Sequence, residues 1–413
     1  MTQLFLKKNK IITIGSGLTF VPNFFSEEGV SISLEKFENK ILINEDEKYV
    51  EASAGLKIST ILNFIIQKNY IIKILPGWPS VTLGGCIANN VHGKNPYSDG
   101  IFEEVVKEIK ILTTDGKIVL ANRVENSELF FNTCGGYGLT GIILSAKIKL
   151  QKIINRTIVQ KKYFVKSLSE TVNILKNNTG SYASYAWHDY SLLKSRWGKG
   201  IVFICNPASE NKKIEKTISS KININKIYQP FNFFNSLTIT IFNLLYYYKN
   251  LIKRSNKQDI LNINFPINNF PLYFMFLLNG KKGFVEYQII IPFEEFDNFI
   301  EKLKEKIFMH KIQIYGNLVK IFNGKQERLN FNQKGVCLNL QFLFNKKDFL
   351  FFNQIDDLVV EHKGITALYK DSRISLEKIK KQYKENYQKF ILFLKKNDPQ
   401  NKFYSIFSNK IGK

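Results

Sequence analysis

The sequence predicts an α+β protein with two domains, and three observations support this. The chain has 413 residues, which is longer than a domain with a single hydrophobic core usually is. Its first third alternates between strand-like and helix-like runs that are separated by glycine-rich turns. From about residue 150, strand-then-helix units recur, which is typical of an antiparallel sheet covered by helices on one side. We therefore expect one domain over residues 1–152 and a second over 153–413.

Local patterns give the expected elements of the first domain. Apolar residues recur at helical spacing over residues 56–69, which predicts a helix. Asp115-Gly116 separates two apolar runs in residues 108–121 and predicts a β-hairpin. Residues 127–150 read as a short helix, a glycine-rich turn and an alternating strand. The other short β-like runs cover residues 10–15, 30–34 and 48–53.

The second domain is expected to contain three strand–helix units. Their strands begin at Arg156, Gly283 and Gly335, and each is followed by an amphipathic run. Residues 206–280 are rich in asparagine and aromatic residues, and we expect them to be irregular. The tail from Glu377 predicts a basic amphipathic helix, most simply a solvated docking helix.

The formal net charge of +24 leaves two interpretations open. A strongly basic chain suits an anionic partner, such as a phosphate group or an acidic membrane surface. Abundant Lys, Ile, Asn and Phe are also typical of proteins from AT-rich genomes, in which lysine accumulates on solvated faces. The positive charge is spread along the chain and no nucleic-acid-binding motif occurs, so we expect no nucleic-acid partner.

The cysteines and the N-terminus indicate a reducing compartment. Cys86, Cys134, Cys205 and Cys337 lie far apart without a CxxC pair, which argues against disulfides and against a zinc site. We expect no bound metal. The first residues contain no apolar core or cleavage site of a signal peptide, so we expect a cytoplasmic protein.

Residues 231–254 form the most apolar stretch of the chain. It is barely long enough to span a bilayer and is interrupted by polar residues, so a spanning helix is not expected. Aromatic residues, among them Phe233, Phe234 and Phe242, precede Lys249, Lys253 and Arg254. This order suits peripheral contact with the inner face of a membrane. The alternative is that the segment packs inside the second domain.

Three glycine-rich turns are the strongest chemical signal. They lie at residues 14–20 (IGSGLTF), 82–95 (TLGGCIANNVHGKN) and 135–141. Glycines let a backbone approach an anionic group closely and offer it N–H groups. The first turn is not a Rossmann fingerprint, because no third glycine opens a helix. Together the three turns could line one dinucleotide.

With these turns in place, the chain resembles the vanillyl-alcohol-oxidase-type flavoproteins, which carry a PCMH-type FAD-binding domain. Within them it is most similar to the decaprenylphosphoryl-ribose oxidase group. The resemblance implies a two-subdomain FAD-binding domain followed by an antiparallel-sheet substrate (cap) domain. The stretches that carry it are PGWPSVTLGGCIANNVHGKN (76–95), LFFNTCGGYGLTGIILSAKIKL (129–150), YAWHD (185–189), GFVEYQIIIP (283–292), LVKIF (318–322) and KDSR (370–373).

The resemblance also implies roles for individual residues. Lys370 and His92 would be catalytic, with Lys370 at the pyrimidine edge of the flavin. Gln288, Lys320 and Asn339 would bind the substrate. The FAD contacts would come from Gly15, Ser16, Gly17, Leu18, Thr19, Gly77, Thr82, Leu83, Gly84, Gly85, Asn89, Asn90, Val91, His92 and Ile143.

The chain departs from the family at several of these places. After the first glycine turn the family usually has Ser-Tyr-Gly-Asp, whereas this chain has Thr-Phe-Val-Pro at residues 19–22. Asn339 stands where the mycobacterial enzymes have a cysteine. Leu18 and Trp78 occupy the positions from which related oxidases tether their flavin. Neither side chain can form that bond, so we expect non-covalent FAD.

The implied function is oxidation of a sugar hydroxyl to a keto group, with hydride transfer to flavin N5. His92 or a pocket lysine of lowered pKa would take the hydroxyl proton, and Lys370 would stabilise negative charge on the flavin. Lys320 suits a phosphate-linked sugar, in this group one carried on a polyprenyl lipid for envelope synthesis. The expected partner is a separate NAD(P)H-dependent short-chain reductase.

Two other interpretations stay open. One is a soluble sugar-lactone or alcohol oxidase that uses oxygen, although the chain lacks the C-terminal His-Trp-x-Lys pattern of that group. The other is a degenerate flavin-fold protein that acts as a scaffold. Outside the site, we expect His188, His310 and His362 to be structural.

Overall fold

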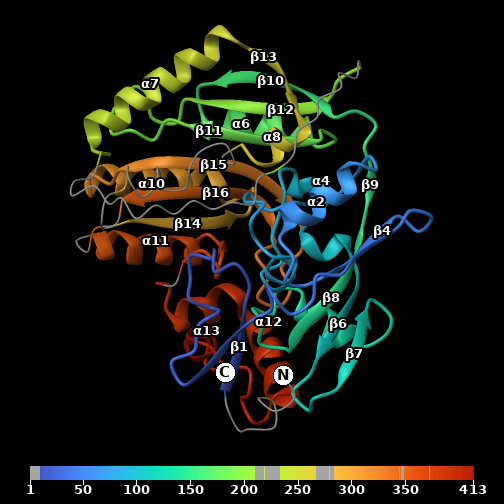
Figure 1. Ribbon diagram of the computed structural model, residues 1–413. Helices are drawn as coiled ribbons and strands as arrows, with labels where there is room; N and C mark the ends of the chain where they lie inside the picture. Colours follow the sequence, from blue (N-terminus) through green and yellow to red (C-terminus); the bar gives the residue numbers. More distant parts are fainter. Residues whose placement is uncertain are drawn as a thin grey trace.

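The computed structural model describes residues 10–209, 218, 233–266, 279, 283–343, 345, 348–371 and 373–413. Figure 1 shows two main sheets, one formed by the first third of the chain and the other by later residues, with helices packed around the second. One sheet has five strands and the other has eight. The predicted α+β class is confirmed.

The five-stranded sheet forms the scaffold of the first part of the chain. Its strand order is β3-β4-β8-β6-β7, and every neighbouring pair is antiparallel. The predicted hairpin joins β6 to β7, with Gly116 at φ +82°, a left-handed conformation that favours glycine. The bounds are β3 (Ile41–Asn44), β4 (Tyr49–Ser53), β6 (Val106–Leu112), β7 (Ile118–Asn122) and β8 (Ile142–Lys149).

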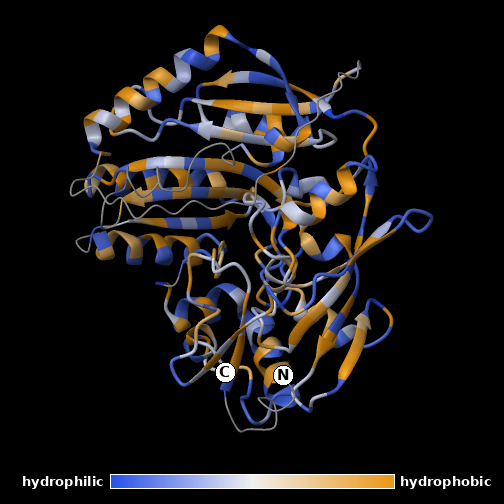
Figure 2. Ribbon diagram, viewed as in Figure 1, coloured by the Kyte–Doolittle hydropathy of each residue, from blue (hydrophilic) through white to orange (hydrophobic). Residues whose placement is uncertain are grey.

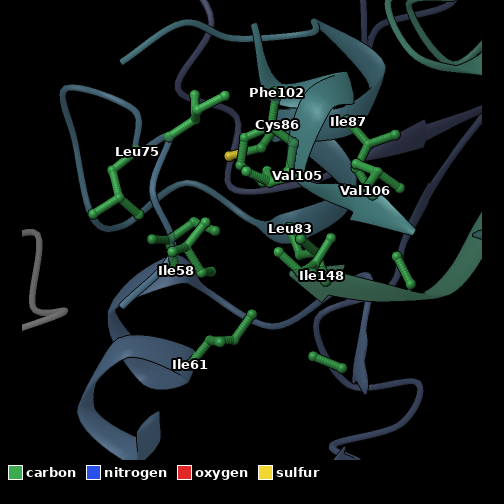
Figure 3. Close-up of a cluster of buried hydrophobic side chains, with 14 of the residues drawn as sticks. Ile58, Ile61, Leu75, Leu83, Cys86, Ile87, Phe102, Val105, Val106 and Ile148 are labelled. Carbon is green, nitrogen blue, oxygen red and sulfur yellow. The ribbon is translucent and has the colours of Figure 1, made fainter. Parts of the chain in front are cut away.

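A separate parallel pair, β1 (Lys10–Ile14) and β2 (Gly29–Ser33), precedes this sheet. Short helices connect the strands, and α2 is shorter than the predicted 56–69. Figure 3 shows the core of this region, in which Leu83 and Cys86 of α3 meet Phe102 and Ile148. The remaining elements are α2 (Ile58–Ile66), β5 (Tyr70–Ile71), α3 (Leu83–Ala88), α4 (Pro96–Asp99), the 3-10 helix Phe102–Val105, α5 (Ser127–Thr133) and β9 (Gln151–Lys152).

The eight-stranded sheet makes up most of the second part. Its order is β13-β10-β12-β11-β15-β16-β14-β17, and all neighbouring pairs are antiparallel, as predicted. The bounds are β10 (Thr157–Val165), β11 (Ala183–His188), β12 (Gly200–Pro207), β13 (Ser255–Asp259), β14 (Phe284–Ile291), β15 (Ile314–Asn323), β16 (Lys334–Leu343) and β17 (Ile365–Thr366).

Helices cover this sheet on both faces. α6 (Leu168–Lys176), α10 (Phe296–Met309) and α11 (Phe349–Glu361) share one apolar core with inward residues of the strands, as the strand–helix units predicted. A fourth helix, α7 (Ser236–Ile252), packs on the opposite face. There Tyr246 contacts Trp187 with ring centroids 4.8 Å apart. The sequence analysis did not predict this second layer.

The prediction that residues 206–280 are irregular is wrong for the part that the structure describes. That part folds as α7, β13 and α8 (Ile260–Asn264), because Asn235 and Asp259 cap the two helices through their side-chain oxygens. Residues 210–217, 219–232, 267–278 and 280–282 lie outside the described residues. Within the described ranges, no helix combines the length and the apolar character needed to cross a membrane.

The C-terminal helix is more than a solvated docking helix. α12 (Leu376–Asn397) changes direction at Lys384, where φ is +47°, and buries Tyr383 and Phe390 in a third core cluster. α13 (Ile406–Lys410) follows it. Between α12 and α13 the chain lies beside β1, since Tyr404 N donates to Ile11 O at 3.0 Å. β1, which leads into the first glycine turn, therefore pairs with a segment near the C-terminus (β1 and α13 are labelled in Figure 1).

Candidate functional site

The three predicted glycine-rich turns lie together. A Cβ on Gly15 would come within 2.3 Å of Thr82 Oγ1, so the first and second turns touch and leave no room for a side chain. Tyr137 N donates to Ala88 O at 2.8 Å, which joins the third turn to the end of α3. A Cβ on Gly138 would lie 3.4 Å from Ile12 Cδ1 of β1. The three turns are far apart in the sequence, but in the structure they lie next to one another.

Hydrogen bonds fix the shape of the first two turns. Ser16 Oγ donates to Ser80 O at 2.6 Å. Thr82 caps α3, because its Oγ1 accepts a bond from Gly85 N at 3.2 Å. Gly17 has φ +64°, a conformation in which other residues are strained. The turn conformation is therefore set by the chain itself.

The open side of these turns fits an anionic group. Gly15, Gly17 and Gly77 are exposed, so their backbones can be approached from outside. A Cβ on Gly77 would meet nothing within 4 Å, which means that space remains in front of this residue. Exposed glycine backbone on adjoining turns is the arrangement that a pyrophosphate requires. The residues present therefore fit the phosphate part of FAD.

Other residues expected to contact FAD lie in different settings. Leu83 and Ile143 are buried in the hydrophobic core, so only their backbone atoms can face a ligand. Asn90 is also buried, and its Oδ1 accepts from Glu103 N at 2.8 Å. Asn89, at the end of α3, accepts from Asn23 Nδ2 at 2.9 Å. Leu18, Thr19, Gly84, Gly85 and Val91 are half-buried around the turns.

The predicted substrate residues share one face of the eight-stranded sheet. Gln288 pairs in register with Asn339, and Lys320 pairs with Cys337, so these side chains point to the same side. Residues between them, such as Tyr287, turn to the opposite face and into the core under α10 and α11. The prediction that Gln288, Lys320 and Asn339 lie together therefore agrees with the register.

His92 reaches this polar face from the second glycine turn. Gln288 Nε2 lies 2.8 Å from His92 Nε2, and Lys320 Nζ lies 3.2 Å from His92 Nδ1. Lys320 Nζ also donates to Gly93 O at 2.7 Å. The imidazole is flanked by the ring of Phe322, with centroids 5.1 Å apart. One contact network thus joins the glycine turn to the sheet.

Burial and like charges set the protonation of this network. Burial holds the pKa of His92 well below its usual range, and the charge of Lys320 lowers it further. Burial also lowers the pKa of Lys320 to about 7, with a further contribution from Lys94. At neutral pH His92 is therefore uncharged, and a large share of Lys320 carries a free lone pair.

Lys370 reaches the same face from the loop after β17. Its Nζ lies 2.7 Å from Glu286 Oε1 and 4.5 Å from the centroid of the Phe20 ring. Glu286 also accepts from Asn339 Nδ2 at 3.2 Å and from Gln341 Nε2 at 3.1 Å. Burial acts to raise the pKa of Glu286, but the charge of Lys370 and these bonds hold it below the usual value. The carboxylate is thus ionised and paired.

Glu286, Gln341 and Phe20 were missed by the sequence analysis. A signal existed for the first two, because polar residues occupy alternate positions of two apolar strands, at 286 and 288 and again at 339 and 341. Phe20 carried no such signal, since only the fold brings it over Lys370.

The residues expected to be structural lie outside this network. His188 is buried, with Nδ1 2.8 Å from Gly198 O and Nε2 3.0 Å from Thr171 Oγ1. His310 and His362 contact Gln354 and Glu295 near α10 and α11. All four cysteines are free and buried.

Comparison with known proteins defines the class. The family model for an FAD binding domain matches residues 5–122, which include the first two glycine turns and His92. The chain therefore contains an FAD-binding domain of the PCMH type. The protein is therefore an FAD-binding oxidoreductase, and the relatives that it matches are named oxidases and dehydrogenases.

Among curated proteins, the chain is similar over nearly its whole length to the decaprenylphosphoryl-beta-D-ribose oxidase of Mycolicibacterium smegmatis. The two are 26% identical over 97% of this chain and 89% of the relative. Shorter matches include the D-arabinono-1,4-lactone oxidase of Candida glabrata, at 24% identity over 46% of this chain and 37% of that protein. A third is a mitochondrial cytochrome-type D-lactate dehydrogenase of Kluyveromyces lactis, at 29% identity over 38% of this chain and 26% of that protein.

Proposed function

We propose that the protein oxidises a hydroxyl of a phosphate-linked sugar to a keto group. The observation that carries this proposal is the polar sheet face beside the second glycine turn, where Lys320 and Gln288 contact His92 and Lys370 pairs with Glu286. Bound FAD, held by the glycine turns, would supply the acceptor for the hydride that leaves the carbinol carbon. The side chains of the sheet face would bind and orient the sugar.

Lys320 is the proposed base for the hydroxyl proton. Its pKa of about 7 leaves a lone pair available at neutral pH, which a general base requires. Both ring nitrogens of His92 already have partners in the protein, Gln288 and Lys320. We therefore assign His92 the role of holding Lys320 and Gln288 in place.

Lys370 is proposed to stabilise the negative charge that develops during the reaction. Its side chain is partly exposed and its ammonium group lies over the Phe20 ring, while Glu286 anchors it from the sheet. A positioned cation of this kind lowers the barrier because it needs no reorganisation. In this view Glu286 is a positioning residue and Lys370 touches the cofactor.

The nature of the sugar is inferred from the full-length similarity to a decaprenylphosphoryl-beta-D-ribose oxidase. We propose a polyprenyl-phosphate-linked pentose, used in cell-envelope synthesis on the cytoplasmic side. A separate NAD(P)H-dependent short-chain reductase would then reduce the keto sugar. The net charge of +24 supports an anionic substrate of this type.

An aldonolactone oxidase is the second candidate. It is supported by the similarity to a D-arabinono-1,4-lactone oxidase and by the two neutral amides, Gln288 and Asn339, which suit an uncharged ring. A scaffold without activity stays as the third alternative. The two oxidase candidates would differ in the substrate that reduces the flavin, whereas a scaffold would not bind flavin.

Anaerobic flavin bleaching tests these alternatives. The purified protein should be yellow, and acid precipitation should leave the colour in the supernatant, because Leu18 and Trp78 cannot tether the flavin. A short-chain prenylphosphoryl pentose should bleach it, whereas an aldonolactone or D-lactate should not. Bleaching by the lactone alone would favour the second candidate. A colourless protein that FAD does not restore would refute both oxidase proposals.

A further inference from the structure

The outward face of α7 is apolar along its whole length. Leu237, Ile241, Leu245, Tyr248 and Ile252 follow one another at intervals of three or four residues, so they form one stripe on the helix. We call these five residues the α7 stripe. Leu237 is 69% exposed, Leu245 67% and Ile252 89%. Figure 2 shows apolar colour along much of this helix at the top of the molecule.

The stripe is not needed to hold α7 on the sheet. The inward face does this, since Ile239 is buried and Asn243 Nδ2 donates to the buried Asp189 at 2.8 Å. Tyr246 packs on Trp187, and Tyr247 on Phe164 with ring centroids 5.3 Å apart. An amphipathic helix normally turns polar residues outward, whereas α7 has apolar residues on both faces. The outer face therefore fits a second apolar surface.

Positive charge gathers at the C-terminal end of the stripe. Lys249, Lys253 and Arg254 are all exposed there. Lys162 Nζ donates to Lys253 O at 2.8 Å. Burial lowers the pKa of Lys162, and the charges of Lys253 and Lys249 lower it further, which shows how closely these cations lie. The sequence contains no Asp or Glu between Glu215 and Asp259. The neighbourhood thus complements an anionic surface.

A row of aromatic rings leads from the start of α7 to Lys370. Phe234 stacks on Tyr315 with centroids 4.8 Å apart, and Tyr315 contacts Phe284 at 6.2 Å. Phe284 contacts Phe20 at 5.5 Å, and Lys370 Nζ lies over Phe20. The rings are therefore a continuous apolar connection between the α7 region and the polar sheet face.

We propose that the α7 stripe docks on an anionic lipid surface, with the stripe in the headgroup–acyl boundary and the three cations on headgroups. An apolar stripe beside basic residues is the usual composition of an interfacial helix. This inference deepens the proposed function, on which it rests for its meaning, because docking of the α7 stripe would bring the Lys370 region, which the aromatic row joins to the start of α7, toward the membrane that holds a lipid-linked sugar. Lipid binding itself can be measured without turnover.

The aromatic residues that the sequence singled out, Phe233, Phe234 and Phe242, are not the best choice for a variant. Phe234 is buried against Tyr315, so its replacement would disturb the fold. The stripe variant is instead Leu237→Ser, Ile241→Ser and Leu245→Ser. The matched control is Val124→Ser, Ile154→Ser and Met309→Ser, which removes three apolar side chains elsewhere that are even more exposed than those of the stripe variant.

Vesicle flotation with the FAD-loaded protein tests the proposal. We expect the wild type and the control variant to float with phosphatidylglycerol-containing vesicles at low salt, and much less with pure phosphatidylcholine. The stripe variant should lose at least ~10-fold in binding, since three apolar side chains no longer enter the lipid. The variant Lys249→Gln, Lys253→Gln and Arg254→Gln should lose roughly fivefold per cation and most of its salt dependence.

Several outcomes would overturn the inference. Absence of wild-type flotation at low salt would do so, as would equal flotation of the stripe and control variants. A concentration-dependent dimer that disappears in the stripe variant, seen by sedimentation, would assign the surface to a second copy of the chain. Failure of the pentose to bleach the flavin while flotation persists would instead sink only the proposed substrate.

Discussion

The carboxylate of Glu286 and the ammonium group of Lys370 lie 2.7 Å apart, at the point where the sheet meets the loop that follows β17. Glu286 is almost fully buried, whereas the Lys370 side chain keeps 24% of its surface exposed. The pair is therefore anchored at its acidic end, and the cation is the member that can face a ligand. Removal of Lys370 should therefore have two distinct effects, one on catalysis and one on the stability of the fold.

Lys370→Met should retain FAD but lose flavin reduction. A positioned charge that acts on a developing anion is typically worth ~10²–10³-fold in rate. The measurement is the anaerobic bleaching rate at saturating substrate. The matched control is Lys381→Met, which removes a lysine paired with Glu377 on the exposed side of α12. Near-normal bleaching of the Lys370 variant would refute the catalytic role.

The same variant should be destabilised in a pH-dependent way. In the wild type the pKa of Glu286 is held below its usual value, so the pair contributes stability above about pH 4.5 and loses it as pH falls through the lowered pKa. Without Lys370, burial dominates and raises that pKa, so ionisation of Glu286 now destabilises the fold. We expect a loss of about 3 kcal/mol at pH 7.5, which shrinks toward pH 4.5.

Urea denaturation at saturating FAD, compared with wild type at each pH, measures this loss. The double variant Lys370→Met, Glu286→Gln provides the control, because it removes the carboxylate whose ionisation costs stability. Its difference from wild type should stay nearly constant above about pH 4.5 and shrink only at lower pH, where the wild type itself loses the stability of the pair. A pH-independent loss in the single variant would show that Glu286 keeps another partner for its charge.

The pH dependence of turnover should report Lys320. Only its unprotonated form can accept the hydroxyl proton, so kcat/KM should rise with pH through an apparent pKa near 7. Lys320→Gln should lose this rising limb and most of the rate. Lys94→Gln offers a sharper check, since the charge of Lys94 lowers the pKa of Lys320. Removing it should move the limb to higher pH. If the rising limb does not move in this variant, it reports the pKa of a group other than Lys320.

Much of the fold was predictable because it depends on local patterns. The turn at Asp115-Gly116 set the β6–β7 hairpin, and the alternation over residues 142–150 marked β8. The glycine turns were recognisable because glycine is required where Gly15 meets Thr82 and where Gly17 has positive φ. In each case the cause of the structure lies within a few residues.

The rest depended on contacts between distant segments. The helix α7 was missed because its outer face is apolar, so it lacks the polar–apolar contrast that marks a surface helix. Glu286 became recognisable as a site residue only when the register placed it beside Asn339 and the loop after β17 brought Lys370 to it. The burial of α12 likewise depends on β1, more than 350 residues earlier in the sequence.

The last prediction tests the cofactor site itself with a change that the apo fold should tolerate. Gly77 has no positive φ, and a Cβ there would meet nothing within 4 Å, so Gly77→Ala should fold normally. If the pyrophosphate of FAD lies against this backbone, the added methyl group would push it away. We expect the FAD Kd to rise at least ~10-fold, which is about 1.4 kcal/mol, and more for Gly77→Val.

Gly180→Ala is the matched control for this change. Gly180 also has open space around its Cβ position, but it lies between α6 and β11, where the neighbouring carbonyls of Thr179 and Ser181 accept bonds from Asn95 at the C-terminal end of the second turn. Titration of the apoprotein with FAD, followed by flavin fluorescence, gives both Kd values, and thermal unfolding without FAD checks the fold. Wild-type affinity in Gly77→Ala and Gly77→Val would remove this turn from the cofactor site. A weaker Kd in the Gly180 variant as well would mean that the effect is not local.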